Sequence, residues 1–312
     1  MISEAVIQAL KRFVPEENMR LQEPMAGHTT FRIGGPADCF VQIENKEQLI
    51  QVLKYLWQVE VPFFVLGNGS NLLVSDKGYQ GIILQIGQKM SKVEVEGDMI
   101  IAQAGASMSQ VARIALDHSL TGLEFASGIP GTIGGGIVMN AGAYDGELSG
   151  VVTQVNVVNS AGECMELEKD SMEFGYRTSI IKNNPFTVTE VILKLEKGDS
   201  EQIKAKMDDL AARRREKQPL EYPSAGSTFK RPKGYFAGKL IMDAGLRGFR
   251  IGGARVSEKH CGFVVNIGNA TAEDVRDVIS EVQERVKERF NINLEPEVLF
   301  LGFDDLRKYT LI

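Results

Sequence analysis

Two glycine-rich segments have the composition of loops that bind phosphate groups. The first, residues 67–71, holds two glycines and three small polar residues, and it directly follows an apolar run that is typical of a strand. Such a loop brings the backbone close to a ligand and directs N–H groups at it, which suits a phosphate or pyrophosphate. A tight turn between strands explains the same residues. The five residues are Gly67, Asn68, Gly69, Ser70 and Asn71.

The second segment spans residues 127–136, and residues 140–144 extend it with more small residues. It contains three consecutive glycines, 134–136, and glycine is costly inside any regular element. We therefore expect backbone that packs hard against something large and flat, or that makes a buried bend. An irregular loop in the core is the alternative. Two glycine-rich segments of the phosphate-binding type in one chain indicate a ligand site more strongly than either segment does alone.

Two charged side chains could handle a carboxylate or a proton. Arg177 follows Tyr176, and a guanidinium beside a phenol is suited to holding a carboxylate. Glu297 stands in an apolar run, where burial would raise its pKa, which is the condition for acting as an acid. A surface arginine and a solvated strand edge are the simpler alternatives. The basic residues within 213–217 end a predicted helix and are more typical of a helix cap than of a substrate clamp.

Ser227 lies among small residues, and Gly226 frees the backbone beside it, so its hydroxyl is open to a ligand. The three histidines, at positions 28, 118 and 260, give no local partner, so a serine hydrolase triad has no support. A serine can instead donate a proton to a carbanion where a flavin and an electrophile lie close.

The composition excludes several functional classes. The chain has 312 residues with 41 acidic and 35 basic side chains, and its net charge of −6 is a poor balance for binding nucleic acid through phosphates. The three cysteines match no disulfide framework, zinc spacing or redox pair, and no metal site is visible. The GxGxxG, Walker A, HExxH and GxSxG motifs are absent, which weakens the corresponding enzyme classes.

Targeting and membrane signals are equally weak. Residues 1–13 carry charges and lack the apolar core of a signal peptide. The longest uncharged stretch, residues 125–144, contains six glycines and a proline, so we do not expect it to span a membrane. We expect a cytoplasmic protein, acting as a monomer, with no membrane or nucleic-acid partner.

Hydrophobic periodicity predicts an α+β chain of two or three domains. The first third predicts a small βαβ unit, with strands at residues 37–43 and 61–66 and between them a helix that Asn45 caps, with Gln48 as its capping-box partner. Further strands are expected at residues 81–86, 93–95, 99–102, 151–158 and 187–195, and further helices are expected after Ser107, over residues 200–217 and after Thr271.

Six motifs follow one another along the chain: residues 30–35, residues 67–71, residues 127–136 with 140–144, Tyr176-Arg177, Gly226-Ser227 and residues 295–298. Their order and spacing resemble the UDP-N-acetylenolpyruvoylglucosamine reductase family, flavoenzymes that complete the muramic acid precursor of bacterial peptidoglycan. The similarity extends from about residue 28 to residue 302. The chain resembles the shorter form of the family, since there is no room for an inserted loop between Tyr144 and Tyr176.

The resemblance implies a two-part FAD-binding fold of the vanillyl-alcohol-oxidase type followed by a C-terminal α+β domain that binds substrate. The expected boundaries are residues 1–82 for the first FAD-binding part, joined by a strand from 294–312, residues 83–218 for the second part, and residues 219–293 for the substrate domain.

The resemblance also implies the chemistry. NADPH would reduce FAD, which then gives hydride to the enolpyruvyl ether of a nucleotide sugar. Ser227 would supply the proton, and Arg177 and Glu297 would stabilise the developing enolate. The implied substrate contacts are Tyr176, Lys217 and Arg231, the last standing where the family has an asparagine. The implied cofactor contacts are Gly67, Asn68, Gly69, Ser70, Asn71, Ser127, Gly128, Ile129, Gly131, Gly134, Asn140 and Ala143.

Two other functions are compatible with the same residues. A flavin-dependent oxidase or dehydrogenase of a small alcohol would keep the cofactor and change the substrate. A binder of a nucleotide sugar without enzymatic activity would use the glycine-rich loops for the diphosphate alone.

Overall fold

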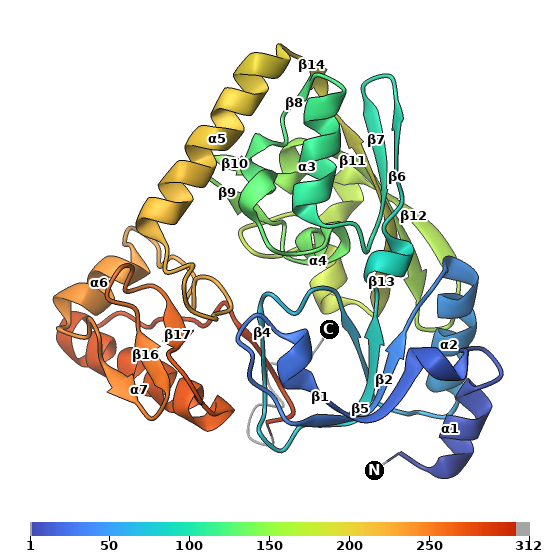
Figure 1. Cartoon of the computed structure of the whole chain (residues 1–312), viewed down its shortest axis with the longest axis horizontal. Helices are drawn as coiled ribbons and strands as arrows, with labels where there is room; N and C mark the ends of the chain where they lie inside the picture. The colour runs from blue at the N-terminus through green and yellow to red at the C-terminus, as the bar shows by residue number, and fades with distance from the viewer. Residues whose placement is uncertain (1, 304–312) are drawn as a thin grey trace.

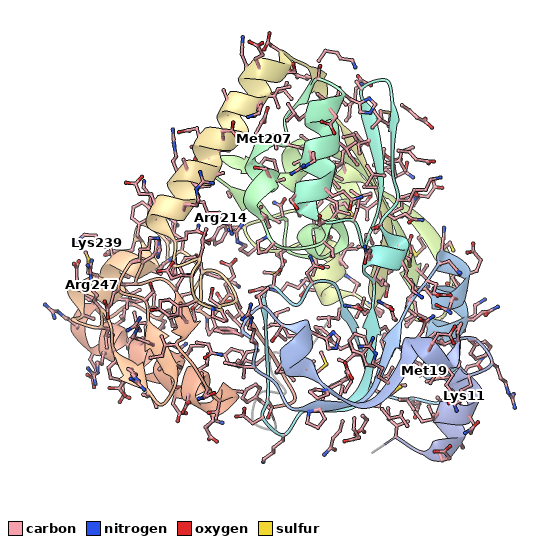
Figure 2. The ribbon with its side chains drawn as sticks, viewed as in Figure 1. Lys11, Met19, Met207, Arg214, Lys239 and Arg247 are labelled. Atoms are coloured by element: carbon pink, nitrogen blue, oxygen red, sulfur yellow. The ribbon has the colours of Figure 1, made fainter. Side chains whose placement is uncertain are left out.

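The structure, a computed structural model, describes residues 2–303. Figure 1 shows three parts: a blue-to-cyan N-terminal part at the lower right, a green-to-yellow part above it, and an orange-to-red part at the left. The long helix α5 (Ser200–Lys217) runs from the second part down to the third. Figure 2 labels Met207 midway along α5 and Arg214 near its lower end.

The N-terminal part contains a four-stranded sheet. Its strand order is β1 (Met19–Pro24), β2 (Pro36–Gln42), β5 (Tyr79–Gln85) and β3 (Phe63–Leu66). The predicted βαβ unit is present, but β2 and β3 do not pair with each other, because β5 lies between them and is parallel to both. The helices of this part are α1 (Glu4–Leu10) and α2 (Lys46–Gln58).

Helix α2 begins where the sequence predicts. The side chain of Asn45 accepts a hydrogen bond from the backbone N–H of Gln48 at 2.8 Å, and the Gln48 side chain accepts from Glu44 N–H. The first bond satisfies a donor at the open end of the helix. The second goes to the residue before the N-cap, so the reciprocal bond of the predicted capping box is not formed with Asn45. One face of the helix is buried: Leu49, Val52, Leu53 and Leu56.

The second part is a five-stranded antiparallel sheet. Its strand order is β12 (Cys164–Glu168), β11 (Val152–Asn159), β13 (Phe186–Lys194), β7 (Met99–Gln103) and β6 (Val93–Glu96). Helices α3 (Met108–Asp117) and α4 (Ile133–Val138) belong to this part. One hydrophobic core joins this sheet to α2 and the N-terminal sheet. The shorter strands are β8 (Leu120–Thr121), β9 (Gly142–Ala143), β10 (Gly146–Glu147) and β14 (Glu196–Lys197).

The third part has a small sheet of β15 (Arg250–Ile251), β16 (Ala254–Val256) and β17 (Val264–Asn266), packed with helices α6 (Ala237–Asp243) and α7 (Ala272–Phe290). Its core also includes Phe31, Ile33 and Leu73 of the N-terminal part. The chain then returns, since β18 (Leu299–Leu301) pairs in parallel with β4 (Leu72–Val74). Residues 304–312 of the predicted terminal strand lie outside the described residues.

Short 3-10 helices complete the described chain. They are η1 (Glu16–Asn18), η2 (Met25–His28), η3 (Gln88–Met90), η4 (Glu124–Gly128), η5 (Leu148–Gly150), η6 (Lys169–Met172) and η7 (Ile180–Asn183). Within residues 2–303, no helix is both long enough and apolar enough to cross a bilayer.

The three consecutive glycines lie inside α4, so the alternative of an irregular loop is wrong for them. Thr132 caps this helix, and its Oγ1 accepts a hydrogen bond from Gly135 N–H. The expected close packing is confirmed, because a Cβ added at Gly134 would stand 2.8 Å from Ala104 Cβ, and one at Gly136 would stand 2.9 Å from Leu148 Cδ1. The glycines therefore let the helix pack closely against its neighbours.

Candidate active site

A cavity of about 1010 Å³ is lined by residues from all three parts. This volume is at the upper end of the range for small-molecule sites. The loop of residues 67–71 lines it, and so do residues from the second glycine-rich segment, from the end of α5 and from the loop before β18. Most of the sequence motifs that could do chemistry therefore share one cavity.

The loop of residues 67–71 is built to approach a ligand closely. Within residues 2–303, none of its five backbone N–H groups has a hydrogen-bond partner in the protein. A Cβ at Gly67 would stand 2.5 Å from Thr132 Oγ1, and Gly69 has a φ of 59° with its missing Cβ 2.0 Å from the His28 carbonyl oxygen. Backbone donors without partners beside a cavity are suited to an anionic group.

The second glycine-rich segment contributes only part of its predicted contacts. Ile129, Gly131, Gly134 and Ala143 line the cavity, whereas three other predicted residues do not. Ser127 Oγ donates to the Glu124 carbonyl, and Gly128 packs against the Arg214 side chain. The third is the buried Asn140, whose side chain is hydrogen-bonded to the backbone around it.

Arg177 and Glu297 form an ion pair in the cavity. Arg177 Nε donates to Glu297 Oε1 at 2.7 Å, and Arg177 Nη2 donates to the Gly142 carbonyl at 3.2 Å. Burial raises the pKa of Glu297, as the sequence predicted, while Arg177 and the nearby Lys182 and Lys230 oppose that rise. The second carboxyl oxygen of Glu297 has no hydrogen-bond partner among the described residues.

Ser227 lies next to this pair because two segments run antiparallel. Glu297 N–H donates to the Thr228 carbonyl at 2.8 Å, and Lys230 N–H donates to the Glu295 carbonyl at 2.9 Å. Ser227 lines the cavity, and its hydroxyl has no protein partner within residues 2–303. The register of the two segments thus brings Ser227 and Glu297 into the lining of the same cavity.

Of the three predicted substrate contacts, only one lines the cavity. Lys217 lines it at the end of α5. Tyr176 is 53% exposed, and its hydroxyl accepts a hydrogen bond from Arg231 N–H at 3.1 Å. The Arg231 guanidinium stacks on the Phe236 ring with 3.9 Å between Cζ and the ring centroid. Tyr176 and Arg231 therefore form a joined group outside the cavity lining.

Two family models match separate stretches of the chain. The model described as "FAD binding domain" matches residues 37–168, and the model described as "UDP-N-acetylenolpyruvoylglucosamine reductase, C-terminal domain" matches residues 218–301. The UDP-N-acetylenolpyruvoylglucosamine reductase of Caldanaerobacter subterraneus subsp. tengcongensis is 52% identical over 301 residues, which are 96% of this chain and 99% of that protein. The chain belongs to the UDP-N-acetylenolpyruvoylglucosamine reductase family.

Solved structures agree with membership of this reductase family. The UDP-N-acetylenolpyruvylglucosamine reductase of Thermus caldophilus is 34% identical with a TM-score of 0.79, covering 91% of this chain and 99% of that one. An alkyldihydroxyacetonephosphate synthase, at 15% identity and a TM-score of 0.50 over 63% of this chain and 41% of that one, shares the fold alone. The family and the FAD-binding fold expected from the sequence are confirmed.

The cavity fits FAD, the cofactor that this reductase family implies. The unpartnered N–H groups of residues 67–71 match a pyrophosphate, and Arg177 and Trp57 line the same cavity as these residues. A β-carbon at Gly67 would meet Thr132, so the close approach needs glycine.

Two cavity residues of the reductase were missed by the sequence analysis. Arg214 lines the cavity together with Lys217, which follows three residues later on α5. Burial lowers the pKa of Arg214. The spacing of three residues on one helix could have shown this shared face. His260 also lines the cavity, and its Nδ1 accepts from Gly262 N–H at 3.1 Å, so a neutral ring carries its proton on Nε2. Burial lowers the pKa of His260 and favours this neutral form.

Proposed function

We propose that the chain catalyses the NADPH-dependent reduction of UDP-N-acetylglucosamine enolpyruvate to UDP-N-acetylmuramate, a step in the synthesis of peptidoglycan precursors. The chain is an FAD-containing oxidoreductase of the family shown by its relatives. The observation that carries the proposal is that Ser227 and the Arg177–Glu297 pair line the same cavity as the loop of residues 67–71. The relatives favour this function over an alcohol oxidase or dehydrogenase and over a binder without activity.

The glycine-rich residues hold the cofactor in this proposal. Bound FAD supplies hydride from N5 for the methylene carbon of the enolpyruvyl group. The backbone N–H groups of residues 67–71 would hold its pyrophosphate, and Ile129, Gly131, Gly134 and Ala143, which line the same cavity, would contact the cofactor. Reducing equivalents come from NADPH, which uses the same cavity before the substrate does.

Ser227 donates the proton in this proposal. Its hydroxyl has no protein partner within residues 2–303, so it is free to reach the substrate carbon that bears the carboxylate. Glu297 acts as a neutral acid, because burial raises its pKa, and it stabilises the negative charge that develops on the substrate carboxylate. The Arg177 guanidinium stabilises the same charge and keeps the Glu297 carboxyl in place.

Cations bind the charged ends of the substrate in this proposal. Lys217 is suited to the diphosphate, and Tyr176 and Arg231 form a joined group outside the cavity lining. We further propose a cytoplasmic enzyme that acts as a monomer.

An anaerobic absorbance spectrum tests the proposal. Flavin bands near ~450 nm should bleach on addition of NADPH, because reduction removes the oxidised chromophore. They should return when the enolpyruvyl nucleotide sugar is added. Bands that bleach and do not return would reject the substrate, and protein that shows no bands after FAD is supplied would reject the cofactor site.

A further inference from the structure

Asn140 lies beside the active site but outside its cavity. It is 1% exposed and follows α4 with a left-handed φ of 42°, which asparagine tolerates better than most residues. Its Nδ2 donates to the Gly175 carbonyl at 3.2 Å, and its Oδ1 accepts from Ser149 N–H at 2.9 Å. Because one partner is an acceptor and the other a donor, a carboxylate or an aliphatic side chain of the same size would fail to satisfy both.

The Gly175 carbonyl belongs to the turn that carries Arg177. Gly175 N–H donates to the Thr178 carbonyl at 3.1 Å, and Thr178 N–H donates to the Gly175 carbonyl at 3.3 Å, so residues 175–178 form a closed turn. Arg177 has a φ of 57° within it, a conformation that is unfavourable for any residue with a Cβ. Contacts from outside the turn must therefore help to hold it.

Asn140 also lies two residues before Gly142, whose carbonyl is the second acceptor of the Arg177 guanidinium. Gly142 supplies the carbonyl that accepts from Arg177 Nη2, while Glu297 accepts from Nε. The Asn140 side chain thus holds the turn from which Arg177 projects, and its backbone leads directly into the carbonyl that fixes the far end of the same side chain. The backbone of Arg177 and its guanidinium are therefore both held by contacts that lead to the buried Asn140.

We propose that Asn140 is a positioning residue that aims the Arg177 guanidinium at Glu297 and the substrate, and that it is not a contact of FAD. The inference rests on the proposed function of Arg177. It replaces the cofactor role that the sequence suggested for Asn140.

The variant Asn140→Ala tests the proposal in the FAD-loaded enzyme. We expect kcat at saturating substrate to fall about 10²-fold, the scale expected when a catalytic group is misplaced by about 1 Å, while the Kd for FAD changes less than threefold. Asn184→Ala is the matched control, because Asn184 Nδ2 donates to the Ile180 carbonyl on the same stretch of chain but outside the turn. A Kd for FAD more than tenfold weaker, with normal kcat once FAD saturates, would make Asn140 a cofactor contact and overturn the proposal.

The pH profile separates positioning from a general loss of structure. Displacing Arg177 removes one of the groups that hold the pKa of Glu297 down, while Lys182 and Lys230 remain in place. The alkaline limb of kcat should therefore move to higher pH in Asn140→Ala and stay unmoved in Asn184→Ala. A loss of kcat with an unmoved limb would give Asn140 a structural role only, against the proposal.

A smaller change keeps the test usable if Asn140→Ala does not fold. Asn140→Ser retains a hydroxyl that can donate and accept, and the same two readouts apply to it. Normal turnover in Arg177→Ala would instead reject the proposed function, whatever Asn140 does, so the two failures are distinguishable.

Discussion

Arg177 Nε lies 2.7 Å from Glu297 Oε1 although the two residues are 120 positions apart in the chain. The Arg177 guanidinium favours the ionised form of Glu297. The pKa of Glu297 is nevertheless raised, because the cost of burying its charge exceeds the attraction of Arg177. A raised pKa favours the protonated form of this carboxyl, which is the form that can act as an acid.

The raised pKa of Glu297 predicts a pH dependence of stability. A carboxyl whose pKa is higher in the folded state stabilises the fold below its unfolded pKa, and this contribution is lost as pH rises through the folded value. The free energy of unfolding of the wild type should therefore fall, relative to Glu297→Gln, as pH rises above about 4.5. Urea unfolding of both proteins at several pH values measures the difference. A free energy of unfolding of the wild type that stays constant or rises relative to Glu297→Gln over this pH range would contradict the assigned direction.

Removing the Ser227 hydroxyl should separate the two half-reactions. In Ser227→Ala we expect reduction of the flavin by NADPH to proceed normally and turnover of the enolpyruvyl substrate to fall at least ~10²-fold, the scale for losing a positioned proton donor. Stopped-flow absorbance follows each half separately. Ser224→Ala, in the same loop but outside the cavity lining, is the control. Normal turnover in Ser227→Ala would remove Ser227 from the mechanism.

Adding one methyl group at Gly67 should weaken cofactor binding. The new Cβ would stand 2.5 Å from Thr132 Oγ1, so either the loop or the start of α4 must shift. We expect a Kd for FAD at least tenfold weaker and a loss of about 1–3 kcal/mol in unfolding free energy. Gly150→Ala, where nothing lies within 4 Å of the added atom, should change neither quantity. Equal behaviour of the two variants would show that residues 67–71 are not in contact with the cofactor.

Trp57 should report binding of FAD. It is the single tryptophan of the chain, it is 56% exposed, and it lines the cavity. If residues 67–71 bind the pyrophosphate and Arg177 marks the reacting end, the apolar end near Trp57 is left for the adenine. We expect FAD to quench the emission of Trp57 and Trp57→Ala to bind FAD more weakly, because stacking on the indole is lost. Unchanged emission while the flavin bands show binding would place the adenine elsewhere.

Asp76 links the N-terminal part to the third part. Its two carboxylate oxygens accept hydrogen bonds from Ala272 N–H at 2.8 Å and Glu273 N–H at 3.1 Å, in the first turn of α7. Asp76→Ala should lower the free energy of unfolding by about 1 kcal/mol, as loss of a helix cap does. Glu288→Ala, on the exposed side of the same helix, is the control. An unchanged midpoint in urea for Asp76→Ala would show that Thr271 alone caps the helix.

Local elements were predictable because their signals act over a few residues. The helix over residues 200–217 has the expected bounds, and Ser107 and Thr271 cap α3 and α7 as expected. The close packing of the triple glycine was predicted but its helix was not, since the cost of glycine in a helix is a local preference that close packing overrides.

The roles of Ser127, Gly128 and Asn140 could not be separated by sequence from those of their neighbours. All three belong to the same small-residue segment as Ile129 and Gly134, yet only the last two line the cavity. Which residues of a loop face a ligand depends on how the loop is anchored, and Asn140 is anchored to a carbonyl 35 residues away.

The sequence by itself determined helices α2, α3, α5 and α7, strands β2, β3, β5, β6, β7, β11 and β13, the two glycine-rich segments and, through the order of its motifs, the family. Only the tertiary structure decided that Arg177, Glu297 and Ser227 share one cavity, that β5 separates β2 from β3, and that Arg214 and His260 join the site. The physical reason is the distance along the chain over which each interaction acts. Capping and periodicity are local, whereas burial, ion pairing and the register between distant segments arise when the chain is folded.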